Sequence, residues 1–211
     1  MFKRPAESNL EIIEGKDWSL GVTKEFKDLV GKNSDLVPTI IELLDKLPKN
    51  TPEGSEVKKN EITLTLVEIR TYCIIYKFEF NNKKFFLKHN SRLLHGSEEV
   101  KSSAKAAELL ADAPGVRVVN FHLGYHDKKR SFFVAEWQDL KPLRAYLSEH
   151  EGEPKREELQ TRLHHIIEIM EKNNFVDAYA HNMFYDPTKD EIILFDLQHG
   201  RPFELKHGTY K

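Results

Sequence analysis

The chain has 211 residues, of which 39% are hydrophobic and 31% are charged, and its formal net charge is −2. This composition fits one globular domain, or one domain with an extension, and excludes a mainly disordered chain. Because the basic excess that nucleic-acid binding usually needs is missing, we expect no nucleic-acid partner.

The N-terminal part, residues 1–58, is predicted to be a mostly helical extension. Its first residues show no apolar signal core, and no apolar run in the chain reaches the length of a membrane span. Its clearest helix follows the potential caps Ser34 and Asp35 and ends before Pro48. Residues 48–59 are interpreted as a linker because they contain Pro and Gly. We expect no membrane span, and a cytoplasmic protein or one secreted without a cleavable signal peptide.

Residues 59–137 are predicted to form an antiparallel sheet with one helix, because alternating apolar and polar residues are separated by turn residues. In chain order the elements are strands at 61–66, 72–80 and 83–89, a helix from Gly96 to about residue 112, and strands at 117–126 and 131–136. Cys73, the only cysteine, lies in the second strand. A single cysteine excludes an intramolecular disulfide and a multi-cysteine zinc site. We predict that the thiol of Cys73 is buried.

Residues 138–211 are predicted to be mainly helical with one β-hairpin. Helices are expected at 143–150 and 157–172, and hairpin strands at 183–185 and 192–195. The longer helix carries apolar residues at helical spacing on one face. The sequence as a whole therefore predicts an α+β fold with the domains 1–58, 59–137 and 138–211.

Five polar residues occupy unusual positions in these elements. Lys88 lies in the apolar third strand and Glu108 on the following helix, where each is also compatible with an ordinary surface residue. Asp177 and Asn182 lie in one loop with the spacing Asp-x-x-x-x-Asn, and Asp196 directly follows an apolar strand. A carboxylate at the end of a buried strand is costly unless it pairs or binds a metal ion.

The order and spacing of these residues resemble those of the protein kinases and their relatives. That family has a lysine on the third strand, a glutamate on the helix, an Asp-x-x-x-x-Asn loop and a metal-binding aspartate after a hairpin. The resemblance covers roughly residues 60–200. It implies a two-lobed kinase-like fold with a five-stranded antiparallel N-lobe sheet plus one helix, and a truncated, mainly helical C-lobe. The short C-terminal part is similar to minimal, atypical kinases, among them shortened bacterial effector kinases.

The resemblance implies that the protein binds ATP with Mg²⁺ or Mn²⁺ and transfers the γ-phosphate to a hydroxyl of a protein or small-molecule acceptor. By this resemblance Lys88, held by Glu108, contacts the α- and β-phosphates, and Asn182 and Asp196 bind the metal ion. Asp177 accepts the proton of the attacking hydroxyl. The backbone of Glu136 and Trp137 binds adenine. The N-terminal extension is expected to bind a protein partner or to cover the surface that the short C-lobe exposes.

The chain departs from the family pattern at several positions. The turn Glu68-Ile69-Arg70-Thr71 contains no glycine, Phe175-Val176 replaces a His-Arg pair, and Gln198 replaces a glycine. Arg70 is either a charged substitute for the glycine-rich loop or an ordinary surface arginine. A pseudokinase that binds nucleotide or a partner without transferring phosphate therefore stays open as an alternative. A metal site formed by Asp177 and neighbouring histidines lacks a third ligand at a clear spacing.

Overall fold

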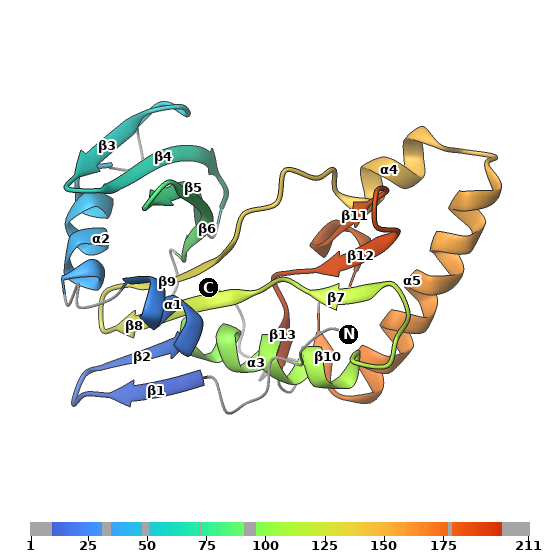
Figure 1. Ribbon diagram of the computed structural model, residues 1–211, viewed down its shortest axis with the longest axis horizontal. Coiled ribbons are helices and arrows are strands. Elements are labelled where there is room, and N and C mark those ends of the chain that lie inside the picture. The colour runs from blue at the N-terminus through green and yellow to red at the C-terminus, as the bar shows by residue number, and fades with distance from the viewer. Residues whose placement is uncertain are drawn as a thin grey trace, which may run out of the picture. The chain divides into compact units, whose positions relative to one another are not determined.

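The structure is a computed structural model that describes residues 10–30, 35–47, 51–71, 73–90, 96–176 and 179–199. Over these residues the chain forms five α-helices and thirteen strands (Figure 1). The predicted α+β class is confirmed. Contacts divide the chain into two compact units. Among the described residues, none of the helices is long and apolar enough to cross a membrane.

The first unit, here called the sheet unit, contains the described residues between 5 and 101 and between 120 and 139. Its framework is an eight-stranded antiparallel sheet. In spatial order the strands are β1 (Leu10–Glu14), β2 (Trp18–Thr23), β8 (Phe121–Asp127), β9 (Ser131–Glu136), β6 (Lys83–Asn90), β5 (Cys73–Phe80), β4 (Ile62–Ile69) and β3 (Glu56–Lys59).

The predicted number of five strands in this sheet is wrong, because β1, β2 and β3 extend it at both edges. The hairpin β1–β2 joins the sheet through pairing of β2 with β8. At the other edge β3 pairs with β4, although its residues were interpreted as linker. These added strands are short and contain mixed polar residues, so their own sequences favour a strand only weakly. Pairing with an existing sheet edge decides their conformation.

Two helices cover one face of the sheet, α1 (Lys24–Val30) and α2 (Leu36–Asp45) (Figure 1). Phe26 of α1 and Leu43 of α2 are buried in the same apolar cluster as Phe78 and Phe132 of the sheet. Burying each such side chain stabilises the fold by about 2–3 kcal/mol. The predicted burial of the Cys73 thiol is confirmed.

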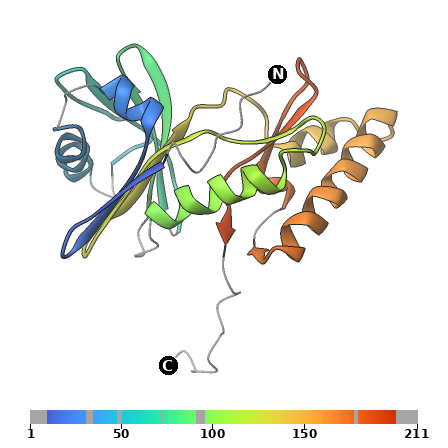
Figure 2. The same cartoon turned by 60° about the horizontal axis from the view of Figure 1, so that its bottom comes forward.

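The second unit, here called the helical unit, contains the described residues of 102–119 and 140–199. It includes most of α3 (Gly96–Leu109), then α4 (Leu143–Glu149) and α5 (Pro154–Lys172), the hairpin β11 (Met183–Asp186) and β12 (Glu191–Leu194), and the short strands β7 (Val116–Val118), β10 (Phe175–Val176) and β13 (Gln198–His199). Figures 1 and 2 both show α4 and α5 beside the hairpin. Apolar residues of α4, α5, β11 and β12 form one cluster, which confirms the predicted amphipathic helix.

The predicted strand 117–126 is two strands in two different sheets. β7 pairs in parallel with β12 in the helical unit, whereas β8 pairs with β9 in the sheet unit. The chain passes from one unit to the other between Val119 and Asn120. The N–H of Val119 donates to Leu194, and the carbonyl of Asn120 accepts from Glu136. The apolar residues before and after Asn120 are together compatible with one strand, so the sequence pattern does not show that the hydrogen-bonding partner changes there.

A cluster of charged residues joins α5 to the turn of the β11–β12 hairpin. Arg162 donates from Nη1 to Asp190 Oδ1 at 2.9 Å, and from Nη2 to the carbonyls of Gly115 at 2.5 Å and Asp190 at 2.9 Å. Asp190 also accepts from Lys155 at 2.8 Å and from the Tyr185 hydroxyl at 2.9 Å. The hydrogen bond from Lys155 is the main reason that the pKa of Asp190 falls to about 2.

Replacing Arg162 by alanine is expected to lower the free energy of unfolding by about 2–3 kcal/mol, because its hydrogen bonds to an ionised partner and to two carbonyls are lost together. Its side chain is only 18% exposed, so water replaces these contacts poorly. Urea denaturation measures the change. Arg156→Ala is the control, since its 3.6 Å ion pair with the exposed Glu151 is expected to contribute less than about 1 kcal/mol. Equal effects of both substitutions would contradict the anchoring role of Arg162.

Candidate active site

Lys88 lies in the interior of the sheet rather than at its edge. It is 6% exposed, and β6 has a neighbouring strand on each side. It pairs with Ile75 of β5 and Phe133 of β9, and directly paired residues point to the same face. Its Nζ lies 5.4 Å from the centroid of the Phe133 ring. This cation–π contact and the burial exclude an edge lysine that faces water.

The Lys88 face of the sheet also carries an aromatic group. The Phe133 ring lies 6.0 Å from the Phe86 ring and 5.0 Å from the Phe121 ring, measured between centroids. The adjacent residue Leu87 belongs instead to the core under α1 and α2. Because neighbouring residues of a strand point to opposite faces, Lys88 lies on the face opposite to these helices. An ammonium among aromatic rings has little water to screen it, which strengthens its attraction for an anion.

Glu136 ends β9, and Trp137 follows it. The N–H of Glu136 donates to the carbonyl of Asn120 at 2.8 Å. Its Oε2 accepts from Asn120 Nδ2 at 3.0 Å. The indole Nε1 of Trp137 donates to Asp139 Oδ1 at 2.6 Å. Because the Glu136 N–H already donates to Asn120, the backbone groups that remain predicted to bind adenine are the Glu136 carbonyl and the Trp137 backbone.

Asn182 and Asp196 lie together at the open end of the β11–β12 hairpin. Asn182 ends a 3₁₀ helix (Ala180–Asn182), and its side chain is buried at 8% exposure. The hairpin pairs Met183 with Leu194, and the Phe195 N–H then donates to the Asn182 carbonyl at 3.0 Å. This register brings an amide and a carboxylate, both oxygen donors, to the same end of one hairpin. Such hard ligands suit Mg²⁺ or Mn²⁺.

Asp196 has an unusual backbone conformation, with φ of +54°. Most side chains avoid this left-handed region, which Asp and Asn tolerate better than bulkier residues. A left-handed non-glycine residue costs on the order of 1 kcal/mol and persists only where surrounding structure maintains it. Here the preceding residue is held by the hairpin hydrogen bond, and Leu197, which follows, is fully buried. Asp196 is therefore held between two anchored neighbours.

Two aromatic residues adjoin this pair of oxygen donors and were not singled out from the sequence. The rings of Phe184 and Phe195 stack with centroids 4.4 Å apart and an interplanar angle of 19°. Both are half-buried, and each is within two residues of Asn182 or Asp196. The stacking of these two rings depends on the hairpin register. Their alternation with Met183 and Leu194 was the only feature of the sequence that could have indicated it.

The other residues predicted for the site are not brought next to Asn182 and Asp196 by any contact that the structure describes. Glu108 lies on α3 in the helical unit and is exposed, so its ion pair with Lys88 of the sheet unit stays a prediction. Asp177, the predicted base, lies outside the described residues. The exposed Arg70 donates to Glu68 Oε2 at 2.7 Å across the turn between β4 and β5. The structure thus brings together Asn182 and Asp196, while the nucleotide contacts assigned to Lys88, Glu136 and Trp137 concern the other unit.

The similarity of this chain to known proteins is structural. No protein-family profile and no curated protein sequence matches the chain. Among solved structures, the chain is similar to the kinase PK-1 of the Cydia pomonella granulovirus, with 15% sequence identity and a TM-score of 0.42. The match covers 77% of this chain and 55% of the viral kinase, so the chain spans little more than half of that protein's length. The function is therefore inferred from this chain's own residues.

Proposed function

We propose that this protein is an ATP-dependent phosphotransferase of the minimal, kinase-like type, which transfers the γ-phosphate of ATP to a hydroxyl of a protein or small-molecule acceptor. The observation that carries the proposal is the placement of Asn182 and Asp196 at the same end of one hairpin. These residues fit Mg²⁺ or Mn²⁺ in chemistry, since both offer oxygen and Asp196 adds a negative charge. A divalent ion held there would neutralise charge on the phosphates.

In this proposal each residue has one task. Asn182 and Asp196 would hold the ion, and phosphate and water oxygens would complete its ligand set. No three His, Cys, Asp or Glu side chains of the described residues gather into a metal site. Lys88 binds phosphate oxygens, and its buried, aromatic surroundings support this role. Asp177 accepts the proton of the attacking hydroxyl. Glu108 orients Lys88.

A nucleotide-binding module without transfer is the second candidate, and the turn between β4 and β5 favours it. This turn contains no glycine whose backbone could approach a phosphate closely. Its arginine, Arg70, is engaged with Glu68. Phosphate positioning, which contributes most of the catalysis in this reaction, would then depend mainly on Lys88 and the ion.

Mg²⁺ and ATP together are expected to raise the melting temperature of the protein, because a ligand that binds only the folded state stabilises it. At one hundred times the dissociation constant the stabilisation is about 2.7 kcal/mol. Lys88→Met keeps the apolar stem, removes the charge, and is expected to reduce this shift strongly. Lys58→Met is the control, since Lys58 is exposed on β3 of the same unit.

The outcomes of this titration separate the two candidates. Absence of any shift contradicts both of them. A shift that Lys88→Met leaves unchanged contradicts the role of Lys88 in binding. A shift accompanied by no transfer of labelled γ-phosphate to any component of a cell lysate favours the binding module over the phosphotransferase.

A further inference from the structure

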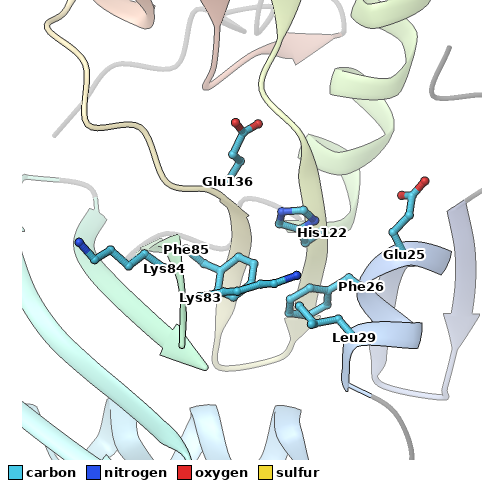
Figure 3. A pocket seen from close by; sticks show the side chains of 8 residues that line it. All are labelled: Glu25, Phe26, Leu29, Lys83, Lys84, Phe85, His122 and Glu136. Carbon is cyan, nitrogen blue, oxygen red and sulfur yellow. The ribbon is translucent and has the colours of Figure 1, made fainter. Parts of the chain in front are cut away.

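The sheet unit contains a cavity of about 390 Å³ next to α1 (Figure 3). Its walls come from α1, from the beginning of β6, from β8 and from the end of β9. All of these segments belong to the sheet unit, and the cavity lies on the helix-covered face, opposite to Lys88. Its volume lies within the range of pockets that bind small organic molecules in proteins.

Three rings form the apolar wall of the cavity. Phe26 and His122 stack with centroids 5.3 Å apart and an interplanar angle of 21°. Phe85 meets Phe26 at 5.5 Å and His122 at 5.3 Å, in both cases nearly edge-on. His122 is the extra residue of a β-bulge, since the pairing of β8 with β9 skips it. Bulges change the direction of a side chain, and this one directs the imidazole against α1.

The charged groups around the cavity are not equivalent. Glu136 accepts hydrogen bonds from Asn120, and Glu25 is also engaged. The amino group of Lys83, in contrast, has no hydrogen bond or ion pair within the described part of the chain, and neither do the ring nitrogens of His122. Figure 3 shows the amino group of Lys83 extending toward the His122 and Phe26 rings, while the carboxylates of Glu25 and Glu136 point away from them. The charge left to attract a ligand is therefore positive.

We propose that this cavity binds a small aromatic carboxylate, with its carboxylate at Lys83 and His122 and its apolar body against Phe26 and Phe85. A cation beside an apolar wall is the arrangement that recognises such a molecule, because the ring buries apolar surface and the carboxylate gains a charge-assisted hydrogen bond. The neutral imidazole of His122 supplies a second N–H donor. This site goes beyond the proposed phosphotransferase function and does not depend on it.

Binding of a carboxylate is expected to be linked to protonation of His122. The pKa of His122 is lowered to about 4, mainly by burial, while Glu136 raises it and Lys83 adds to the lowering. The charged groups near the ring are Lys83 and Lys84 of β6, Glu136 of β9 and Glu25 of α1. An added anion favours the imidazolium and raises the pKa of His122 toward its ordinary value, so affinity is expected to be roughly three- to fivefold higher at pH 5.5 than at pH 7.5.

The test uses 1-naphthoate as the probe and 1-naphthylmethylammonium as a matched cation, with the whole 211-residue chain and without ATP. Naphthoate is expected to shift the NMR signals of the His122 ring and to bind more tightly at pH 5.5, whereas the cation is expected not to bind in the cavity. Lys83→Met is expected to weaken naphthoate binding about tenfold. The exposed position of Lys83 allows this change without loss of the fold, and Lys58→Met is the control.

His122→Phe is a second variant that keeps an aromatic ring in the wall. It is expected to retain binding of naphthoate and to lose the dependence of affinity on pH between 5.5 and 7.5. The proposal is overturned if naphthoate does not bind at millimolar concentration, if the ammonium probe binds as well as naphthoate, or if Lys83→Met leaves the affinity unchanged. Because no nucleotide is present, none of these results bears on the phosphotransferase proposal.

Discussion

Replacing Asp196 by asparagine is expected to reduce the transfer of γ-phosphate by roughly 10²–10³-fold, because a metal ion contributes several kcal/mol of charge stabilisation to such a reaction. Asparagine has nearly the same shape as aspartate and also tolerates the left-handed backbone, with φ of +54°, found at this position. The substitution therefore removes the negative charge while the hairpin end is expected to persist. A loss of phosphate transfer would then indicate weaker binding of the metal ion rather than loss of the fold.

The measurement is the transfer of labelled γ-phosphate from ATP to the components of a cell lysate, with the melting temperature as a check on the fold. Asp112→Asn is the matched control, since Asp112 is exposed in the same unit and lies in the segment after α3. It is expected to leave transfer unchanged. If Asp196→Asn and Asp177→Ala both transfer phosphate at the normal rate, the assignment of the site to these residues is wrong.

Lowering the pH from 7 to 4 is expected to remove up to about 3 kcal/mol of stability through His122 alone. Burial lowers the pKa of His122 in the folded protein to about 4, below the usual value of 6.5. The unfolded chain therefore takes up this proton at a higher pH than the folded chain does. The stabilising contribution is fully present above about pH 6.5 and is lost as the pH falls toward 4.

Urea denaturation at pH 7 and pH 4.5 measures this effect as a difference between the unmodified protein and His122→Phe. The comparison is needed because the chain contains ten histidines. His122→Phe keeps a ring that can stack on Phe26 but has no proton to gain. His165→Phe, on the exposed side of α5, is the control and is expected to retain the full pH dependence. An identical pH dependence in all three proteins would contradict the role assigned to His122.

The elements that were predicted well are those whose periodicity is long or whose turns are local. β4 alternates between buried and half-buried residues over its first five positions, and a short local turn at residues 81–82 joins β5 to β6. α5 keeps its apolar stripe from Leu159 to Met170. The strands of the eight-stranded sheet that were missed, β1, β2 and β3, are four to six residues long and extend the sheet at its edges. For such segments the pairing partner, which is distant in the chain, contributes more than their own propensity.

The candidate residues follow the same division. The juxtaposition of Asn182 and Asp196 could be anticipated, because a short hairpin with a Pro-containing turn brings the ends of its two strands together. The burial of Lys88 could not be anticipated, because the sequence of an edge strand and that of an interior strand with this composition are alike. The cavity beside His122 was not predicted at all. It depends on a bulge in β8 and on α1, two features without a periodic signal.

By itself, the sequence determined the α+β class, the main helices and strands, and the order of the polar residues that point to phosphate chemistry, because these depend on interactions between near neighbours. Only the tertiary structure decided that the sheet has eight strands, that Lys88 is buried against Phe133, and that Lys83 and His122 face one cavity. These features come from contacts between residues far apart in the chain, and their free energy depends on packing and desolvation that no local pattern encodes.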